Sequence, residues 1–126
     1  MKQFLTLDDL PDLDQAIKEG IALKKEPYKW EALGNQKTLG MLFFNPSLRT
    51  RLSTQKAAQQ LGIKTMIMNF SNEAWAVEYE DGTQMSGLRS EHIREAAAVI
   101  SQYCDVVAIR AFASLTDKEK DESEQV

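Results

Sequence analysis

Apolar positions near the start of the chain recur with the spacing of an amphipathic helix, which Asp12 would begin and Pro27 would end. Asp12 is a favourable N-cap residue, and Gln15, three residues further on, is expected to complete a capping box with it. The apolar positions of this predicted helix are Leu13, Ala16, Ile17 and Ile21.

Two short, continuous apolar runs follow, and the segment between them has helical spacing. Residues 39–44 (LGMLFF) end at Asn45-Pro46, which predicts a buried strand that enters a tight turn. A helix is predicted from about Ser47 to Leu61, because small and apolar residues recur there at helical intervals and Gly62 can act as its C-cap. Residues 64–70 (KTMIMNF) predict a second strand.

The second half of the chain repeats this alternation after a long polar segment. Residues 71–90 show no clean period and contain two glycines, so we predict a long loop. Ser90 is expected to cap a third helix with Glu91 in its first turn, and residues 105–112 (DVVAIRAF) predict a third strand. The resulting order of a helix followed by β-α-β-α-β predicts an α/β fold, a parallel open sheet with helices on both faces.

Composition narrows the class of protein. The chain has 126 residues, of which 43% are hydrophobic and 27% charged, enough for one core and too few for two. A net charge of −4 argues against a nucleic-acid partner, and a single cysteine fits a reducing compartment. The sequence has no basic, apolar signal segment at its start and no apolar run near the ~20 residues that cross a bilayer. We therefore expect a cytoplasmic protein with no membrane partner.

Polar and basic residues follow the predicted strands at the points where ligands bind in parallel sheets. The residues after each strand gather at one edge of such a sheet. This rule would bring together residues 45–51 (NPSLRTR), the loop that holds Trp75, and Arg110 at the end of the third strand. A helix N-terminus with hydroxyls from Ser47 and Thr50 is typical of an anion site.

Arg49 and Arg51 would add permanently charged, planar groups to that site, and Arg110 a further cation from the third strand. The alternative is that Arg49 and Arg51 are solvated helix residues and that Arg110 pairs with a local acid. The chemistry of these residues alone favours neither interpretation.

Two longer motifs resemble the transcarbamylase family. The first, residues 43–58 (FFNPSLRTRLSTQKAA), closely resembles the family's carbamoyl-phosphate motif. The second, residues 91–112 (EHIREAAAVISQYCDVVAIRAF), resembles the family segment that ends in an arginine contacting carbamoyl phosphate. The resemblance extends over essentially the whole chain and implies a site without metal or cofactor. It implies that carbamoyl phosphate is bound by Ser47, Leu48, Arg49, Thr50, Arg51 and Arg110, with Arg110 and Thr50 nearest the reacting atoms.

The segment EAWAVEYEDG, which contains Trp75, resembles the N-acylornithine branch of this family. In that branch the tryptophan reaches into the site of an adjacent subunit, which implies a homotrimer. Leu48 stands where aspartate and ornithine enzymes usually have threonine, and residues 71–90 lack the lysine of the aspartate enzymes. Ser90 departs from the proline or glutamate expected in the succinyl and acetyl enzymes, while Arg89 could meet a succinyl carboxylate.

The resemblance implies carbamoyl transfer to the δ-amine of N-succinyl- or N-acetylornithine in arginine biosynthesis. It also implies that residues 1–115 form most of a carbamoyl-phosphate domain and that an ornithine-binding domain lies beyond Val126. Residues 116–126 hold five acids and two lysines and are expected to fray. The alternatives are an ornithine or aspartate transcarbamylase, and a non-catalytic phosphate-binding module.

The remaining candidate residues favour structural roles. His92 is expected to cap a helix or lie at the surface, and Cys104 to be a buried, inert thiol on the apolar side of a helix. Glu78, Glu80 and Asp81 are expected to form a solvated loop, because no matching ligands suggest a metal.

Overall fold

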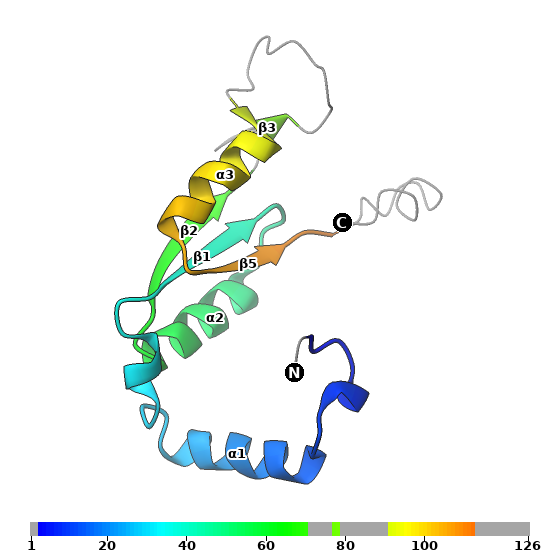
Figure 1. Cartoon of the computed structure of the whole chain (residues 1–126), viewed down its shortest axis with the longest axis vertical. Coiled ribbons are helices and arrows are strands. Elements are labelled where there is room, and N and C mark those ends of the chain that lie inside the picture. The colour runs from blue at the N-terminus through cyan, green and yellow to red at the C-terminus, as the bar shows by residue number, and fades with distance from the viewer. Residues whose placement is uncertain (1–2, 71–76, 79–90, 113–126) are drawn as a thin grey trace.

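The computed structural model describes residues 3–70, 77–78 and 91–112. Within these residues the main sheet has three parallel strands in the order β2-β1-β5, so both neighbours of the central strand follow it in sequence (Figure 1). The strands are β1 (Thr38–Phe43), β2 (Lys64–Asn69) and β5 (Val106–Arg110). The helices are α1 (Leu13–Lys25), α2 (Leu48–Gln60) and α3 (Ile93–Tyr103), with short 3-10 turns η1 (Leu7–Asp9) and η2 (Glu31–Gly34).

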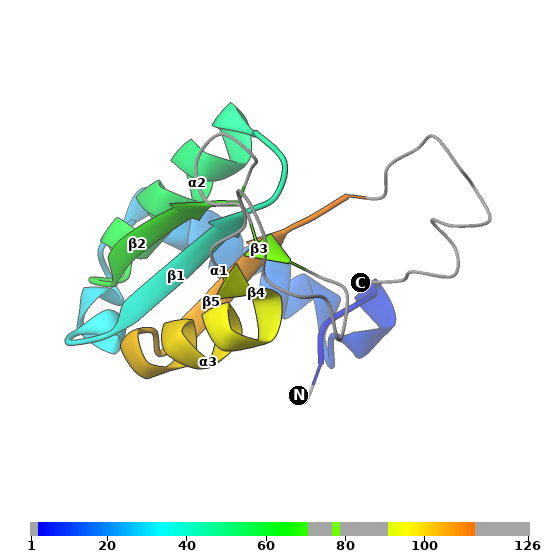
Figure 2. The same cartoon turned by 90° about the horizontal axis from the view of Figure 1, so that it is seen from above.

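Strand β1 is buried on both faces, and its alternate residues contact different helices. Leu39, Met41 and Phe43 pack with Ala58 of α2. Leu42 faces the other way and belongs to a second cluster that includes residues of α3. Helices α2 and α3 therefore cover opposite faces of the sheet (Figure 2), as predicted from the continuous apolar run.

Helix α1 begins at Asp12 as predicted, but its capping box does not close. The Asp12 carboxylate accepts a hydrogen bond from the Gln15 backbone amide at 2.9 Å. The Gln15 side chain donates to Glu19 at 2.9 Å instead of returning to Asp12, because a charged acceptor lies one turn further along the same helix face. The apolar positions Ile17 and Ile21 are 52% and 55% exposed, so the described residues do not bury this face.

Helix α3 begins later than predicted, and the assignment of Ser90 as its N-cap is wrong. The cap is His92, whose Nδ1 accepts from the Arg94 amide at 3.2 Å while Glu95 accepts from the His92 amide. The short strand β4 (Glu91–His92) pairs in parallel with β3 (Val77–Glu78), which holds the chain extended up to residue 92. The helix can start only after this pairing ends, and the capping role expected for His92 is confirmed.

The segment predicted as a long loop contains strand β3, and one of its acids is buried. Val77 is 4% exposed and packs in the cluster beside α3, and Glu78 is 7% exposed. The expectation of a solvated Glu78 is wrong because its strand pairs with β4 and contacts α3. Glu80 and Asp81 lie outside the described residues.

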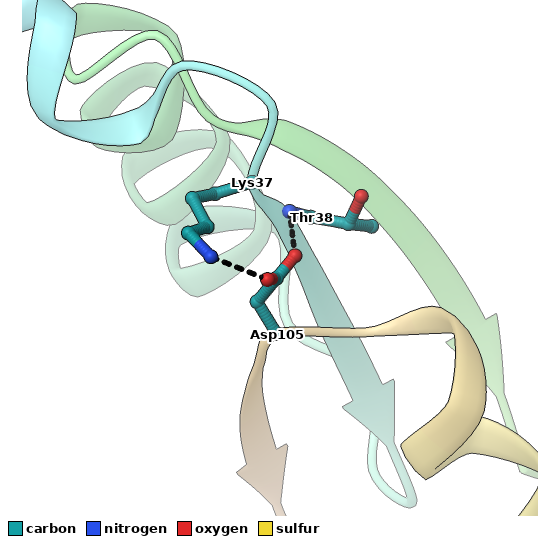
Figure 3. Close-up of polar contacts among 3 residues, drawn as sticks. All are labelled: Lys37, Thr38 and Asp105. Atoms are coloured by element: carbon teal, nitrogen blue, oxygen red, sulfur yellow. Dashed lines mark hydrogen bonds and ion pairs between the residues drawn. The ribbon is translucent and has the colours of Figure 1, made fainter.

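The amino ends of β1 and β5 are joined by Asp105. Its carboxylate accepts from Lys37 Nζ at 2.8 Å and from the Thr38 amide at 2.9 Å (Figure 3). The Asp105 amide in turn donates to the Thr38 carbonyl at 2.9 Å. The hydrogen bond from Lys37, followed by that from the Thr38 amide, holds the pKa of the Asp105 carboxyl below its ordinary value.

The part of the chain that the structure describes shows neither a membrane-spanning helix nor a cluster of metal ligands. None of its helices combines the length and apolar character that a membrane crossing requires. It also contains no group of three or more histidine, cysteine or acidic residues placed to hold a metal ion.

Candidate functional site

The turn from β1 into α2 presents the N-terminus of a helix at the carboxyl edge of the sheet. Ser47 is the N-cap residue of α2, and its hydroxyl oxygen accepts from the Thr50 amide at 3.3 Å. The Ser47 hydroxyl also donates to Thr50 Oγ1 at 3.0 Å. The first turn of α2 contains no acidic residue, so no carboxylate there offsets the positive end of the helix dipole. This end of the helix is chemically suited to an anion.

Arg110 reaches the same place from the third strand of the sheet. Register pairs Phe43 with Arg110, and the Arg110 carbonyl accepts from the Phe44 amide at 2.9 Å. The Arg110 Nη1 atom lies 3.4 Å from Thr50 Oγ1, and its guanidinium carbon lies 4.2 Å from the Phe112 ring centroid. The expected meeting of these two parts of the chain is therefore present in the structure.

The Arg110 side chain carries a donor with no acceptor. Its Nε atom is buried without a hydrogen-bond partner in the structure. The salt bridge between Lys37 and Asp105 does not involve Arg110, which forms no ion pair with another described residue. Leaving a buried charged donor unsatisfied is costly, which favours an external anion over an acid from the described residues.

Arg51 lies one turn into α2 and is held by the end of β2. Its Nη2 atom donates to Asn69 Oδ1 at 2.6 Å, and its guanidinium carbon lies 4.8 Å from the Phe43 ring centroid. Arg49 and Leu48, by contrast, are exposed. The three arginines thus differ: Arg51 and Arg110 have fixed partners, and Arg49 extends from the surface of the helix.

Asn69 is a residue of this region that sequence reasoning missed, and Asn45 belongs to the predicted group 45–51 but was given no role of its own. The Asn45 side-chain oxygen accepts from the Phe112 amide at 2.8 Å, which ties the turn after β1 to the chain after β5. Asn69 is the last residue of β2. The rule that strand ends gather at one edge could have identified Asn69 as well, since it stands near the end of the predicted strand 64–70.

Trp75, Arg89 and Ser90 lie outside the described residues. The structure brings together the N-terminus of α2, the hydroxyls of Ser47 and Thr50, and two arginines. Of these arginines, Arg110 has an unsatisfied Nε atom and Arg51 is held by Asn69. This arrangement can bind a phosphate-like anion and stabilise negative charge beside it.

Comparison with known families agrees with this chemistry. Residues 2–126 match the model of the aspartate/ornithine carbamoyltransferase carbamoyl-P binding domain. Because this match spans nearly the entire chain, the chain belongs to that family.

Among its relatives are enzymes named for two N-acylornithines. The chain is 44% identical over 126 residues to N-succinylornithine carbamoyltransferase of Bacteroides thetaiotaomicron, a match that covers all of this chain and 40% of the relative. It is 36% identical over 128 aligned positions to N-acetylornithine carbamoyltransferase of Xanthomonas campestris, covering all of this chain and 37% of the relative. The chain therefore spans about two fifths of the length of these relatives.

Solved structures of one such enzyme share the fold. A glutamate-to-serine mutant of N-acetyl-L-ornithine transcarbamylase, complexed with carbamyl phosphate and N-succinyl-L-norvaline, matches with a TM-score of 0.77 and 37% identity. That match covers all of this chain and 38% of the other. Acetylornithine transcarbamylase complexed with acetylcitrulline matches with a TM-score of 0.76 and 35% identity over 99% of this chain and 37% of the other. The predicted parallel sheet with helices on both faces is thereby confirmed.

Proposed function

We propose that the complete protein containing this chain transfers a carbamoyl group from carbamoyl phosphate to the δ-amine of an N-acylornithine, and that this chain supplies the carbamoyl-phosphate site. The observation that carries the proposal is the meeting of Arg110 with Thr50, at 3.4 Å, where the buried Nε atom of Arg110 lacks an acceptor among the described residues. The names of the relatives support the choice of reaction.

In this reaction the neutral δ-amine attacks the carbonyl carbon of carbamoyl phosphate. A carbon–nitrogen bond forms, the bond from that carbon to the bridging oxygen breaks, and phosphate leaves with the electron pair while the amine loses a proton. Ser47, Arg49 and Arg51 would hold the phosphate together with the α2 amides. Arg110 and Thr50 would lie beside the carbonyl and bridging oxygens, where negative charge grows as the bond breaks.

No step of this scheme requires a covalent enzyme intermediate, a metal or a cofactor. The rate would come from holding two substrates together and from preorganised positive charge. Leu48 and Trp75 would complete the binding surface, with Trp75 serving the site of a neighbouring subunit in a cytoplasmic homotrimer. We further propose a second, ornithine-binding domain in the complete protein and a carbamoyl-phosphate domain ending near residue 115.

We favour N-succinylornithine over N-acetylornithine as the acceptor. Identity to the succinyl enzyme is 44% against 36% for the acetyl enzyme. A glutamate-to-serine variant of the acetyl enzyme was solved with a succinylated analogue, and this chain has Ser90 where the resemblance leads us to expect proline or glutamate. Arg89 would offer a cation to the succinyl carboxylate.

Free ornithine is the second candidate acceptor. Similarity to the catabolic ornithine carbamoyltransferase of Thermoplasma volcanium, at 38% identity over 107 residues, favours it. Free ornithine carries an α-ammonium group, which a site built for a neutral amide would have to bury unpaired. The two acceptors therefore make opposite predictions about substrate preference.

The deciding experiment compares three acceptors on the complete protein at equal carbamoyl phosphate. We expect kcat/KM for N-succinyl- or N-acetylornithine to exceed that for ornithine by at least ~100-fold, the scale on which unpaired polar groups are rejected. Within the pair, succinylornithine should react faster. A higher value for ornithine would assign the protein to the ornithine enzymes, and no transfer to any acceptor would leave only a phosphate-binding module.

A further inference from the structure

We propose that Asn69 is a positioning residue of the carbamoyl-phosphate site, which orients Arg51 through a neutral hydrogen bond and leaves its positive charge available to the anion. The inference rests on the proposed function and adds a residue outside the motif that carries it. Asn69 is remote in sequence from Arg51, 18 positions further along the chain.

The fold brings the two residues together through the parallel register of the sheet. Phe43 of β1 is paired with Asn69 of β2, and Arg51 lies on the helix that connects these strands. The Arg51 guanidinium donates from Nη2 to Asn69 Oδ1 at 2.6 Å and lies 4.8 Å from the centroid of the Phe43 ring. The hydrogen bond and the aromatic ring constrain the guanidinium from two strands at once.

The chemistry of the pair fixes which atoms meet. A guanidinium has five N–H donors and no acceptor, so only the oxygen of the Asn69 amide can face it. One of these donors is used by Asn69, and no other hydrogen bond of the Arg51 side chain occurs among the described residues. The remaining donors of the planar group stay available for phosphate oxygens.

A neutral acceptor matters because of what a carboxylate would do in its place. Aspartate has the same shape as asparagine and would accept a stronger hydrogen bond from Arg51. It would also place a negative charge beside the cation and cancel much of the attraction for phosphate. A purely structural Asn69 would therefore tolerate aspartate or gain from it, whereas a positioning residue for an anion site would not.

The test compares Asn69→Asp with the parent in the complete protein, using Asn35→Asp as a matched control. Asn35 is the C-cap residue of η2, before β1 begins, so the control adds the same charge at the opposite end of that strand. The measurements are KM for carbamoyl phosphate, the dissociation constant of inorganic phosphate, and Tm. We expect Asn69→Asp to raise both constants about tenfold, with Tm unchanged or higher, because one charge near the surface acts on another at short range. Asn35→Asp should change neither constant.

Two further measurements separate positioning from simple packing. Because Asn69 is exposed, the effect of aspartate should shrink as salt is added. Asn69→Ala, which loses the hydrogen bond without adding charge, should raise KM less than aspartate does. If Asn69→Asp unfolds, the alanine variant decides, and it supports the proposal only if KM for carbamoyl phosphate rises while KM for the acceptor does not.

The proposal is overturned if Asn69→Asp leaves both constants as in the parent, or if alanine is more harmful to them than aspartate. Failure of the proposed function would look different. A parent protein that binds inorganic phosphate but transfers no carbamoyl group contradicts the proposed reaction, while the phosphate measurements on the Asn69 variants still decide the role of Asn69.

Discussion

The three arginines at the carboxyl edge of the sheet differ in the contacts that their side chains make with the rest of the protein. Arg51 is oriented by Asn69, and Arg110 is oriented by Thr50 and Phe112 while its Nε atom stays unsatisfied. Arg49 is exposed. An arginine that supports little of the surrounding structure can be removed with little effect on folding, so its loss should report on anion binding alone.

We expect Arg49→Ala to abolish use of carbamoyl phosphate by the complete protein while leaving Tm nearly unchanged. Truncating one partner of a buried charge-assisted pair costs about 2–5 kcal/mol, and Arg49 would form such a pair once the phosphate covers it. Arg49→Lys should regain little of the activity that Arg49→Ala loses, because the point charge of an ammonium group does not reproduce the planar guanidinium. Steady-state kinetics and thermal unfolding measure both effects. An alanine variant with near-parental activity would remove Arg49 from the site.

At the scale of elements, the centre of β1 packs closely against its neighbours. Gly40 lies in the centre of β1, and a Cβ atom at that position would come within 2.7 Å of Cys104 Sγ and 3.3 Å of Met68 Cε. Cys104 is the C-cap residue of α3. It is partly buried, so the expectation of a fully buried thiol is too strong, and its sulfur occupies the space that glycine leaves.

Gly40→Ala should therefore destabilise the fold by about 1–3 kcal/mol, the usual cost of overpacking a tight core. The variant Gly40→Ala with Cys104→Ala should regain part of that loss, because removing the sulfur leaves room for the added methyl group. Denaturant unfolding of the two single variants and the double variant measures the coupling. Strictly additive effects would show that the contact between β1 and α3 is not the cause.

The hydrogen bonds of Asp105 join the start of β5 to the start of β1, and they give a pH-dependent prediction. The pKa of Asp105 is lowered in the folded protein, so its carboxylate stabilises the fold above the unfolded-state pKa of about 3.9. That contribution is lost as the pH falls through the lower, folded-state pKa. Asp105→Asn should lower Tm at neutral pH, and the difference from the parent should shrink below about pH 4. A difference that does not depend on pH would point to packing instead of charge.

At the scale of the whole molecule, the described residues leave much apolar surface uncovered. The apolar face of α1 and the edge strand β5 are both exposed, with Val106 at 52% and Ile109 at 62%. Exposed apolar surfaces of this kind are typical of interaction sites. They agree with a chain that spans about two fifths of the length of its relatives.

We accordingly expect the 126-residue chain by itself to show no carbamoyl transfer. Bringing two substrates together in a fixed geometry supplies up to ~7–11 kcal/mol of a reaction's barrier reduction, and the second substrate's site is proposed to lie elsewhere in the complete protein. A citrulline assay with a no-protein control and an Arg49→Ala control tests this. Product above both controls would place the acceptor site within this chain.

The order of apolar runs was enough to predict the sheet and its two covering helices. A strand buried on both faces must be apolar along its length, and residues 39–44 satisfy this condition. The start of α2 at about Ser47 was also predicted from the sequence, and in the structure Ser47 is the N-cap through a hydrogen bond between residues only three apart. The roles in substrate binding assigned to Trp75, Arg89 and Ser90 stay predictions.

What the sequence could not determine depends on contacts between distant segments. The start of α3 was misplaced because the pairing of residues 77–78 with 91–92 overrides local capping preferences. The partners of Arg51 and Arg110 follow from the register of β1 with β2 and β5, which a one-dimensional pattern does not contain. The sequence by itself determined which elements form and which residue types reach one edge of the sheet. Only the tertiary structure decided which of those side chains meet, because that depends on register and packing between elements far apart in the chain.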